Sequence, residues 1–159
     1  MIKTAKISNC GQYRYELRRT WDRSKGKVLF IGLNPSTADA TSEDNTSRVC
    51  INYAKKWGFG GLIIANLYAF RATLPKDLWN AENPIGPKND AHLKKLIAEA
   101  DMCLCAWSQL NKNPQRTQIV LEMIANPMCL CILKDGSPGH PLYKSKNLTP
   151  IKYDFRFTS

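Results

Sequence analysis

Four apolar segments of strand length alternate along the chain with segments of helical periodicity. The apolar segments cover residues 28–31, 62–68, 101–107 and 128–133, and between them apolar residues recur at the spacing of an amphipathic helix. Strands that alternate with helices in this way pair in parallel through right-handed crossovers. The sequence therefore predicts an α/β fold built on a central, mainly parallel, four-stranded sheet.

A further β element precedes these four segments. Residues 7–20 alternate apolar and polar positions in the manner of a half-buried strand, whereas residues 71–87 and 134–159 are rich in turn-forming residues and are expected to be loops. The chain has 159 residues, with no internal repeat and no low-complexity linker. We therefore expect a single domain over residues 1–159.

The net charge of +10 is concentrated at the two ends of the chain. Residues 1–27 carry +6 and residues 134–159 carry +3, which leaves +1 for the 106 residues between them. This distribution indicates a basic surface for a polyanion such as nucleic acid, with a surface that serves only solubility as the alternative. The N-terminus lacks the apolar core of a signal peptide and no apolar run could cross a membrane. We therefore expect a cytoplasmic monomer with no membrane partner.

Four of the six cysteines form two Cys-x-Cys pairs inside apolar segments. These are Cys103 with Cys105, and Cys129 with Cys131. We interpret them as small buried hydrophobic residues of a reducing compartment. A metal or iron–sulfur site is the alternative, but the spacing does not match the usual zinc patterns. No metal and no cofactor are therefore expected.

Polar and aromatic residues follow each of the four apolar segments. Because parallel strands end at the same edge of a sheet, where open α/β sheets bind ligands, these residues are expected to meet there. Gly32 allows a tight turn directly after the first strand, and Pro35 holds the residue before it in an extended conformation. The residues expected at this edge are Asn34, Ser36, Thr37, Asn66, Tyr68, Arg71, Trp107, Ser108, Lys134, His140 and Tyr143.

Three of these segments resemble motifs of the uracil-DNA glycosylase superfamily. The stretch Gly32-Leu33-Asn34-Pro35-Ser36 resembles its first motif, especially in the mismatch-specific branch. Residues 64–71 are similar to the strand whose asparagine binds the target base, and residues 139–143 resemble the second motif, which inserts into DNA. The motifs occur in the expected order. The resemblance implies a three-layer α/β/α sandwich and the activity of a DNA glycosylase.

The whole chain also resembles a bacterial and phage family of unknown function. Its members share the stretches that are here Gly-Leu-Asn-Pro-Ser-Thr-Ala-Asp from residue 32, Trp-Gly-Phe-Gly-Gly-Leu from residue 57 and Asn-Leu-Tyr-Ala-Phe-Arg-Ala-Thr from residue 66. Some antiphage glycosylases that remove glucosylated cytosines look similar. This likeness implies a modified pyrimidine in phage DNA as the substrate and antiviral defence as the role.

The resemblance assigns roles to individual residues. Asn34 would orient a water molecule and His140 would donate a hydrogen bond to the departing base. An acid near Asn34 could activate the water instead; Asp39 is the candidate, with Asp44 as the alternative. The expected base-binding residues are Pro35, Asn66, Tyr68 and Phe70. The expected DNA-binding residues are Ser36, Thr37, Arg48, Arg71, Tyr143, Lys144 and Lys146.

The sequence thus predicts an enzyme that hydrolyses the N-glycosidic bond of a modified pyrimidine in DNA, flips the base out of the duplex and leaves an abasic site. Two alternatives stay open. One is a nucleotide or nucleoside hydrolase that uses the same edge of the sheet on a small substrate. The other is a nucleic-acid-binding module without chemistry.

Overall fold

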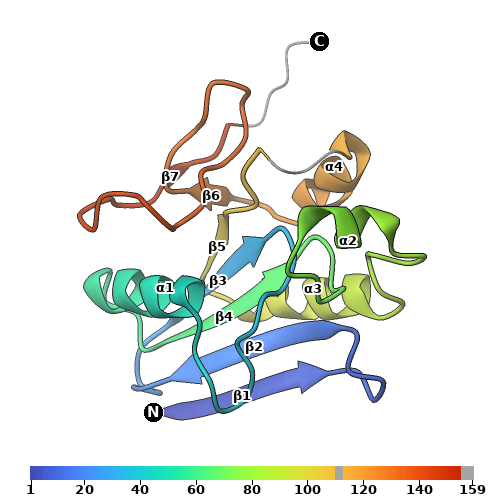
Figure 1. Cartoon of the computed structure of the whole chain (residues 1–159). Helices are drawn as coiled ribbons and strands as arrows, with labels where there is room; N and C mark the ends of the chain where they lie inside the picture. The colour runs from blue at the N-terminus through green and yellow to red at the C-terminus, as the bar shows by residue number, and fades with distance from the viewer. Residues whose placement is uncertain (110–112, 155–159) are drawn as a thin grey trace.

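The computed structural model describes residues 1–109 and 113–154, which form a mixed α/β fold with one seven-stranded sheet (Figure 1). The strands are β1 (Ile2–Ile7), β2 (Arg14–Thr20), β3 (Lys27–Gly32), β4 (Gly61–Asn66), β5 (Met102–Cys105), β6 (Pro127–Cys129) and β7 (Ile151–Lys152). The four helices of the described chain are α1 (Asn45–Lys56), α2 (Pro75–Asn80), α3 (Asn89–Glu99) and α4 (Pro114–Glu122).

The strands lie in the order β1-β2-β4-β3-β5-β6-β7. The inner strands β4, β3, β5 and β6 are parallel, as the alternation of strands and helices predicts. The sheet nevertheless has three more strands than that parallel core. The β1–β2 hairpin extends it antiparallel at one edge, and β7 pairs antiparallel with β6 at the other.

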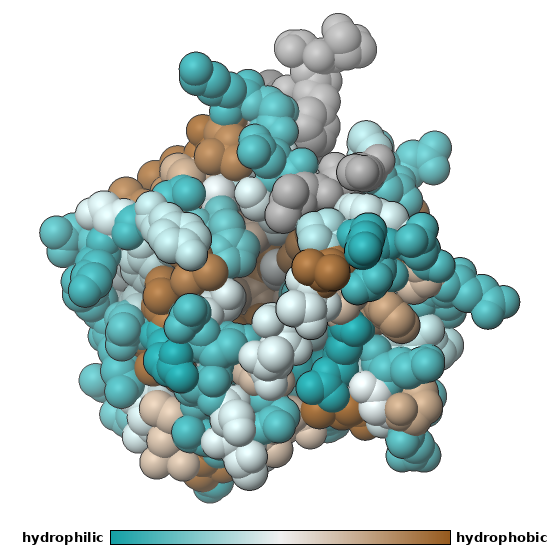
Figure 2. Space-filling model, viewed as in Figure 1, coloured by the Kyte–Doolittle hydropathy of each residue, from teal (hydrophilic) through white to brown (hydrophobic). Residues whose placement is uncertain are grey.

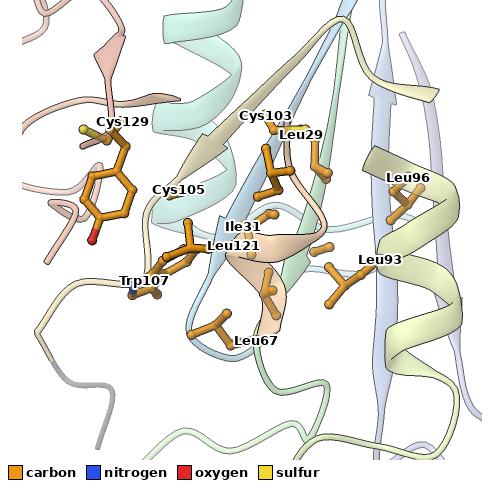
Figure 3. Close-up of a cluster of buried hydrophobic side chains, with 14 of the residues drawn as sticks. Leu29, Ile31, Leu67, Leu93, Leu96, Cys103, Cys105, Trp107, Leu121 and Cys129 are labelled. Atoms are coloured by element: carbon orange, nitrogen blue, oxygen red, sulfur yellow. The ribbon is translucent and has the colours of Figure 1, made fainter. Parts of the chain in front are cut away.

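Strand β3 lies in the middle of the sheet and is buried on both faces. Leu29 and Ile31 face a hydrophobic cluster that includes residues of α2, α3 and α4. Figure 3 shows this cluster, with the labelled leucines, cysteines and Trp107 packed together. Val28 and Phe30 alternate with them and face a second cluster that includes residues of α1. Helix α1 therefore covers one face of the sheet, and the other three helices cover the opposite face.

Several boundaries differ from the sequence-based expectation. β6 is short and ends at Cys129, because the chain then turns and Ile132 forms a bridge with Pro138. The region 71–87, expected to be a loop, contains the helix α2, which begins with a proline at its first turn. β1 and β7 were not predicted because both are mainly exposed and lack an apolar pattern.

The cysteines of the central strands are free thiols packed in the core. Cys103, Cys105 and Cys129 are buried, and Cys131 is half-buried. Burial raises the pKa of Cys103 and of Cys129 to about 11, so these thiols stay protonated. The interpretation as small buried hydrophobic residues is confirmed for Cys103, Cys105 and Cys129. Over the described ranges no helix is both long and apolar enough to span a membrane.

Candidate functional site

A cavity of about 220 Å³ lies at the carboxyl ends of β3, β4 and β5, on the face covered by α1. This edge of the parallel strands is the one at which open α/β sheets bind ligands. In Figure 2 the face shown is hollowed near its middle, between the elements that Figure 1 labels α1 and α2. The polar residues that line the cavity are Arg14, Asn34, Ser36, Asp44, Thr46, Asn66, Ser108 and His140.

The cavity brings together three residues from distant parts of the chain. Asn34 follows β3, Asn66 ends β4, and His140 belongs to the long segment after β6; all three line the cavity. Backbone hydrogen bonds hold the segments in place: Ser108 N donates to Pro138 O at 2.9 Å, which fixes the His140 segment beside the end of β5. The juxtaposition expected from parallel strand ends is therefore present for these three residues.

Asn34 presents a hydrogen-bond acceptor. Its Nδ2 donates to the backbone oxygens of Ala72 at 2.7 Å and of Pro35 at 3.2 Å. A carbonyl oxygen can only accept, so these bonds fix which end of the amide is the nitrogen. No described residue donates to Asn34 Oδ1. The amide oxygen of this cavity residue is thus available to a water molecule or a ligand.

Asn66 presents a donor. Its side chain is 3% exposed, and its Nδ2 has no hydrogen-bond partner. A buried donor without a partner costs about 1–3 kcal/mol, so a water molecule or a ligand that accepts from it would recover this cost. The carbonyls at this end of β4 are held by Asn89, whose Nδ2 donates to Asn66 O at 3.0 Å, and by Arg116, whose Nε donates to Leu67 O at 2.9 Å. Asn66 is therefore rigidly placed with an unused donor in the cavity.

His140 is a neutral donor. Its Nδ1 accepts a hydrogen bond from Leu142 N at 3.1 Å, so in the neutral ring the proton lies on Nε2. Burial lowers the pKa of His140, and the nearby Lys144 lowers it further, while Asp44 acts in the opposite direction. The neutral imidazole can donate from Nε2 without being charged itself.

Asp39, predicted as the acid of the site, does not line the cavity. Its Oδ1 accepts from the backbone N–H groups of Thr41 and Ser42, which lower the pKa of Asp39 and make it a turn-forming residue. The alternative, Asp44, does line the cavity. It caps α1, and its Oδ1 accepts from Ser47 N at 2.8 Å. Of the two acids considered, Asp44 is therefore the one at the cavity, and a catalytic role for either stays a prediction.

The two aromatic residues predicted to bind the base do not line the cavity. Tyr68 belongs to the core on the α2–α4 face, edge-on to Trp79. Phe70 packs against the same core and against Tyr13. Both lie outside the cavity because the chain beyond β4 continues toward β2 and α2. The aromatic rings that line the cavity are instead Phe30 and Trp107.

The remaining predicted contacts are divided between the cavity and the surface. Ser36 lines the cavity, whereas Pro35 is buried beside it without lining it. Thr37 is exposed, and Arg48 is exposed on α1 with its Nη1 bonded to Asn45. Arg71 contacts the turn between β1 and β2, where its Nη1 donates to Gly11 O. None of these last three lines the cavity.

A basic groove of about 530 Å³ adjoins the cavity and shares Pro141 with it. Lys144 and Lys146 line it, as does Tyr143, which is 97% exposed and has a left-handed backbone with φ +63°. Two further lysines, Lys55 and Lys56 of α1, lie on the opposite wall and were not predicted. Lys56 Nζ donates to Lys146 O at 2.9 Å, which joins the two walls.

Arg14 was not predicted as a site residue. The alternation in residues 7–20 places it on the same side as Glu16, but the register of β2 against β1 shifts between these two residues. Arg14 lies in the cavity with Leu17, whereas Glu16 pairs with His92 and Lys95 of α3. Arg14 therefore lines the cavity while buried. Burial lowers its pKa to about 10, which leaves the guanidinium charged at neutral pH. Among the described residues no cluster of three or more His, Cys, Asp or Glu side chains could hold a metal ion.

The fold and the site define an α/β protein with a cavity at the carboxyl edge of its parallel strands, in which polar side chains meet among apolar ones, and with a basic groove beside it. Residues 14–142 match the model of a family described as "Protein of unknown function (DUF1643)", and the chain belongs to this family. No curated protein and no solved structure matched the chain.

Proposed function

We propose that this protein is a DNA glycosylase that hydrolyses the N-glycosidic bond of a modified pyrimidine, such as a glucosylated hydroxymethylcytosine of phage DNA, and leaves an abasic site. The observation that carries this proposal is the meeting of three complementary groups in one cavity: the free acceptor of Asn34, the unpartnered donor of Asn66 and the neutral donor of His140. The cavity is smaller than the roughly 300–1,000 Å³ of sites for drug-sized ligands, which suits a single extruded base.

In the proposed reaction, a water molecule attacks the anomeric carbon of the sugar as the bond from that carbon to the base nitrogen breaks. The bonding electrons pass to the base, and a proton lost by the water finally replaces the sugar on the base. Asn34 Oδ1 accepts a hydrogen bond from the water and thereby orients it; Asp44 is the nearest acid that could accept its proton. Orientation of this kind supplies several kcal/mol.

The two donors act on the base. His140 Nε2–H donates to a base oxygen as negative charge develops there, and this interaction is stronger in the transition state than in the ground state. Asn66 Nδ2 donates to another acceptor on the pyrimidine edge and fixes the orientation of the base. The basic groove supports a polymeric substrate, because its four lysines lie beside the cavity and can contact backbone phosphates.

The proposal also covers the fold family, the cellular location, the oligomeric state and the biological role of the protein. The placement of α1 on one face of the sheet and α2–α4 on the other supports the three-layer α/β/α sandwich of the uracil-DNA glycosylase superfamily. We propose in addition that the protein acts as a cytoplasmic monomer in antiviral defence, without a metal or cofactor.

The test is to incubate the full chain with genomic DNAs that carry different modified pyrimidines. Alkali cleavage scores abasic sites, and mass spectrometry identifies the released base. We expect one class of modified DNA to be cleaved, and Asn34→Ala to lower the rate about 100-fold. Asn80→Ala, at the exposed end of α2, is the matched control and should retain full activity.

The alternatives give different results in the same assay. A nucleoside or nucleotide hydrolase would release base from monomers and show little dependence on salt. A module without chemistry would bind DNA with a salt slope, and no variant would change the amount of released base. Either result would exclude the glycosylase.

A further inference from the structure

Arg14 differs from the other buried arginines of the described chain in having no carboxylate partner. Arg19 Nε lies 2.8 Å from Glu43 Oε1, and Arg116 Nη2 lies 2.7 Å from Asp90 Oδ1. Arg14 is 3% exposed, yet its Nη1 donates only to a backbone carbonyl at 3.0 Å, and its Nε–H has no partner. A buried charge without a counterion is costly, because the lost hydration is not replaced.

Asp44 lines the same cavity and interacts electrostatically with Arg14, but it does not neutralise this charge by contact. Both of its oxygens are used by backbone groups: Oδ1 accepts from Ser47 N at 2.8 Å and Oδ2 from Ala38 N at 3.2 Å. Within the described ranges no ion pair joins it to Arg14. Asp44 therefore reduces the cost of burying Arg14 only through space.

A second buried donor in the same cavity has the same deficiency. Asn66 and Arg14 both line the cavity, and Asn66 Nδ2, like Arg14 Nε, lacks an acceptor. Two unpartnered buried donors, one of them cationic, are complementary to an oxyanion, which offers several lone pairs and a negative charge. The depth of Arg14 also matters: a group carried on an extruded base can reach it, whereas a backbone phosphate would stay at the surface.

We propose that Arg14 is the anion-binding residue of the cavity and that, among modified pyrimidines, one with an oxyanion substituent such as a carboxylate is preferred over one with a neutral glucosyl group. That the ligand is a base rests on the proposed function; the requirement for an oxyanion rests on Arg14 and Asn66 alone. A phosphate group shares this chemistry, so the experiment separates the two sources.

The experiment measures binding of free ligands to the full chain by calorimetry. The probes are 5-carboxyuracil, uracil and inorganic phosphate. We expect 5-carboxyuracil to bind at least about tenfold more tightly than uracil, since a hydrogen bond to a charged group contributes this much or more. Arg14→Gln should remove that preference, and Arg14→Lys should keep part of it. Arg18→Gln, which removes the same charge from the ion pair with Glu99, is the matched control and should leave it unchanged.

A second measurement on the unaltered protein covers the case in which Arg14→Gln does not fold. The Nε–H resonance of Arg14 in a ¹⁵N spectrum should shift on saturation with 5-carboxyuracil. Equal binding of uracil and 5-carboxyuracil, tighter binding of phosphate than of either base, or an unmoved Arg14 resonance would each overturn the proposal. The anion site and the glycosylase can fail separately. Carboxylate-selective binding without base excision would overturn the glycosylase and leave the anion site. Excision by the Arg14→Gln variant at the rate of the parent protein would overturn the anion site and leave the glycosylase.

Discussion

The side-chain oxygen of Asn66 occupies the space that a side chain at residue 32 would need: Oδ1 would lie 2.8 Å from a Cβ placed on Gly32. The two residues are register partners at the ends of the parallel strands β3 and β4. The glycine at the end of β3 therefore does more than permit a turn. It leaves room for the amide of the neighbouring strand to lie against the sheet with its donor unused.

Gly32→Ala should displace the Asn66 amide and abolish most of the proposed excision activity. Because the end of a side chain can move more easily than backbone, we expect little change in the melting temperature but a loss of activity of about 100-fold, the scale of a small misplacement in an active site. Asn66→Ala should give a similar loss with Gly32 intact. Full activity in Gly32→Ala would mean that the position of Asn66 is not used.

Excision should fall as the pH is lowered through the pKa of His140, because protonation of Nδ1 removes the acceptor for Leu142 N and so breaks the contact that holds the ring in place. Its pKa in the folded protein is below the ordinary value of 6.5, chiefly because of burial, so the unfolded chain binds the proton more readily. The contribution of neutral His140 to stability is thus complete above pH 6.5 and is lost on acidification. The imidazole resonances of His140, followed by NMR over a pH series, measure the pKa of His140 directly.

Lys144 offers a specific check of that shift. It lowers the pKa of His140, so Lys144→Ala should raise this pKa toward 6.5. Lys146→Ala removes an equal charge from the same groove and serves as the control. If both variants titrate as the parent protein does, the charge of Lys144 has no influence on the ring.

The basic groove should contribute salt-dependent affinity for DNA. Alanine at Lys55 or Lys146 should each lower the slope of log K against log salt by about 0.9 if the lysine contacts one phosphate of duplex DNA. Lys76→Ala, on exposed α2, should leave the slope unchanged. Binding isotherms at several salt concentrations provide the measurement, and equal slopes for all three variants would place the DNA elsewhere.

Glu99 should stabilise the fold above its ordinary pKa of 4.5 and lose this effect in acid. Hydrogen bonds from Arg18, and then from Lys27, hold its pKa at about 2 against the effect of burial. Because the folded-state pKa is lowered, the stabilisation is present above 4.5 and disappears as the pH falls toward 2. Glu99→Gln should therefore have a lower urea midpoint at pH 7 than the parent protein, by an amount that shrinks in acid.

The control for this prediction is Glu122→Gln. Glu122 is exposed on α4 and takes part in none of the ion pairs of the described chain. Its urea midpoint should follow that of the parent protein at every pH. A Glu99→Gln variant that behaved in the same way would show that the contact with Arg18 contributes nothing.

The sequence by itself determined the parallel core and the edge at which the site lies. Both follow from local periodicity, since apolar runs that alternate with helices leave few topologies and place Asn34 and Asn66 at neighbouring strand ends. The long segment that carries His140 was predicted from its motif to meet them, and it lines the same cavity.

Only the tertiary structure decided which neighbours each side chain has. Arg14 is in the cavity because the register of β2 against β1 shifts at Tyr15, and an alternating sequence does not show such an irregularity. Asp44 rather than Asp39 lines the cavity because the turn at Asp39 uses its carboxylate for backbone N–H groups. Tyr68 and Phe70 lie in the opposite core because the chain turns away after β4. These outcomes depend on contacts between segments that are distant in the chain, and the local sequence pattern does not specify such contacts.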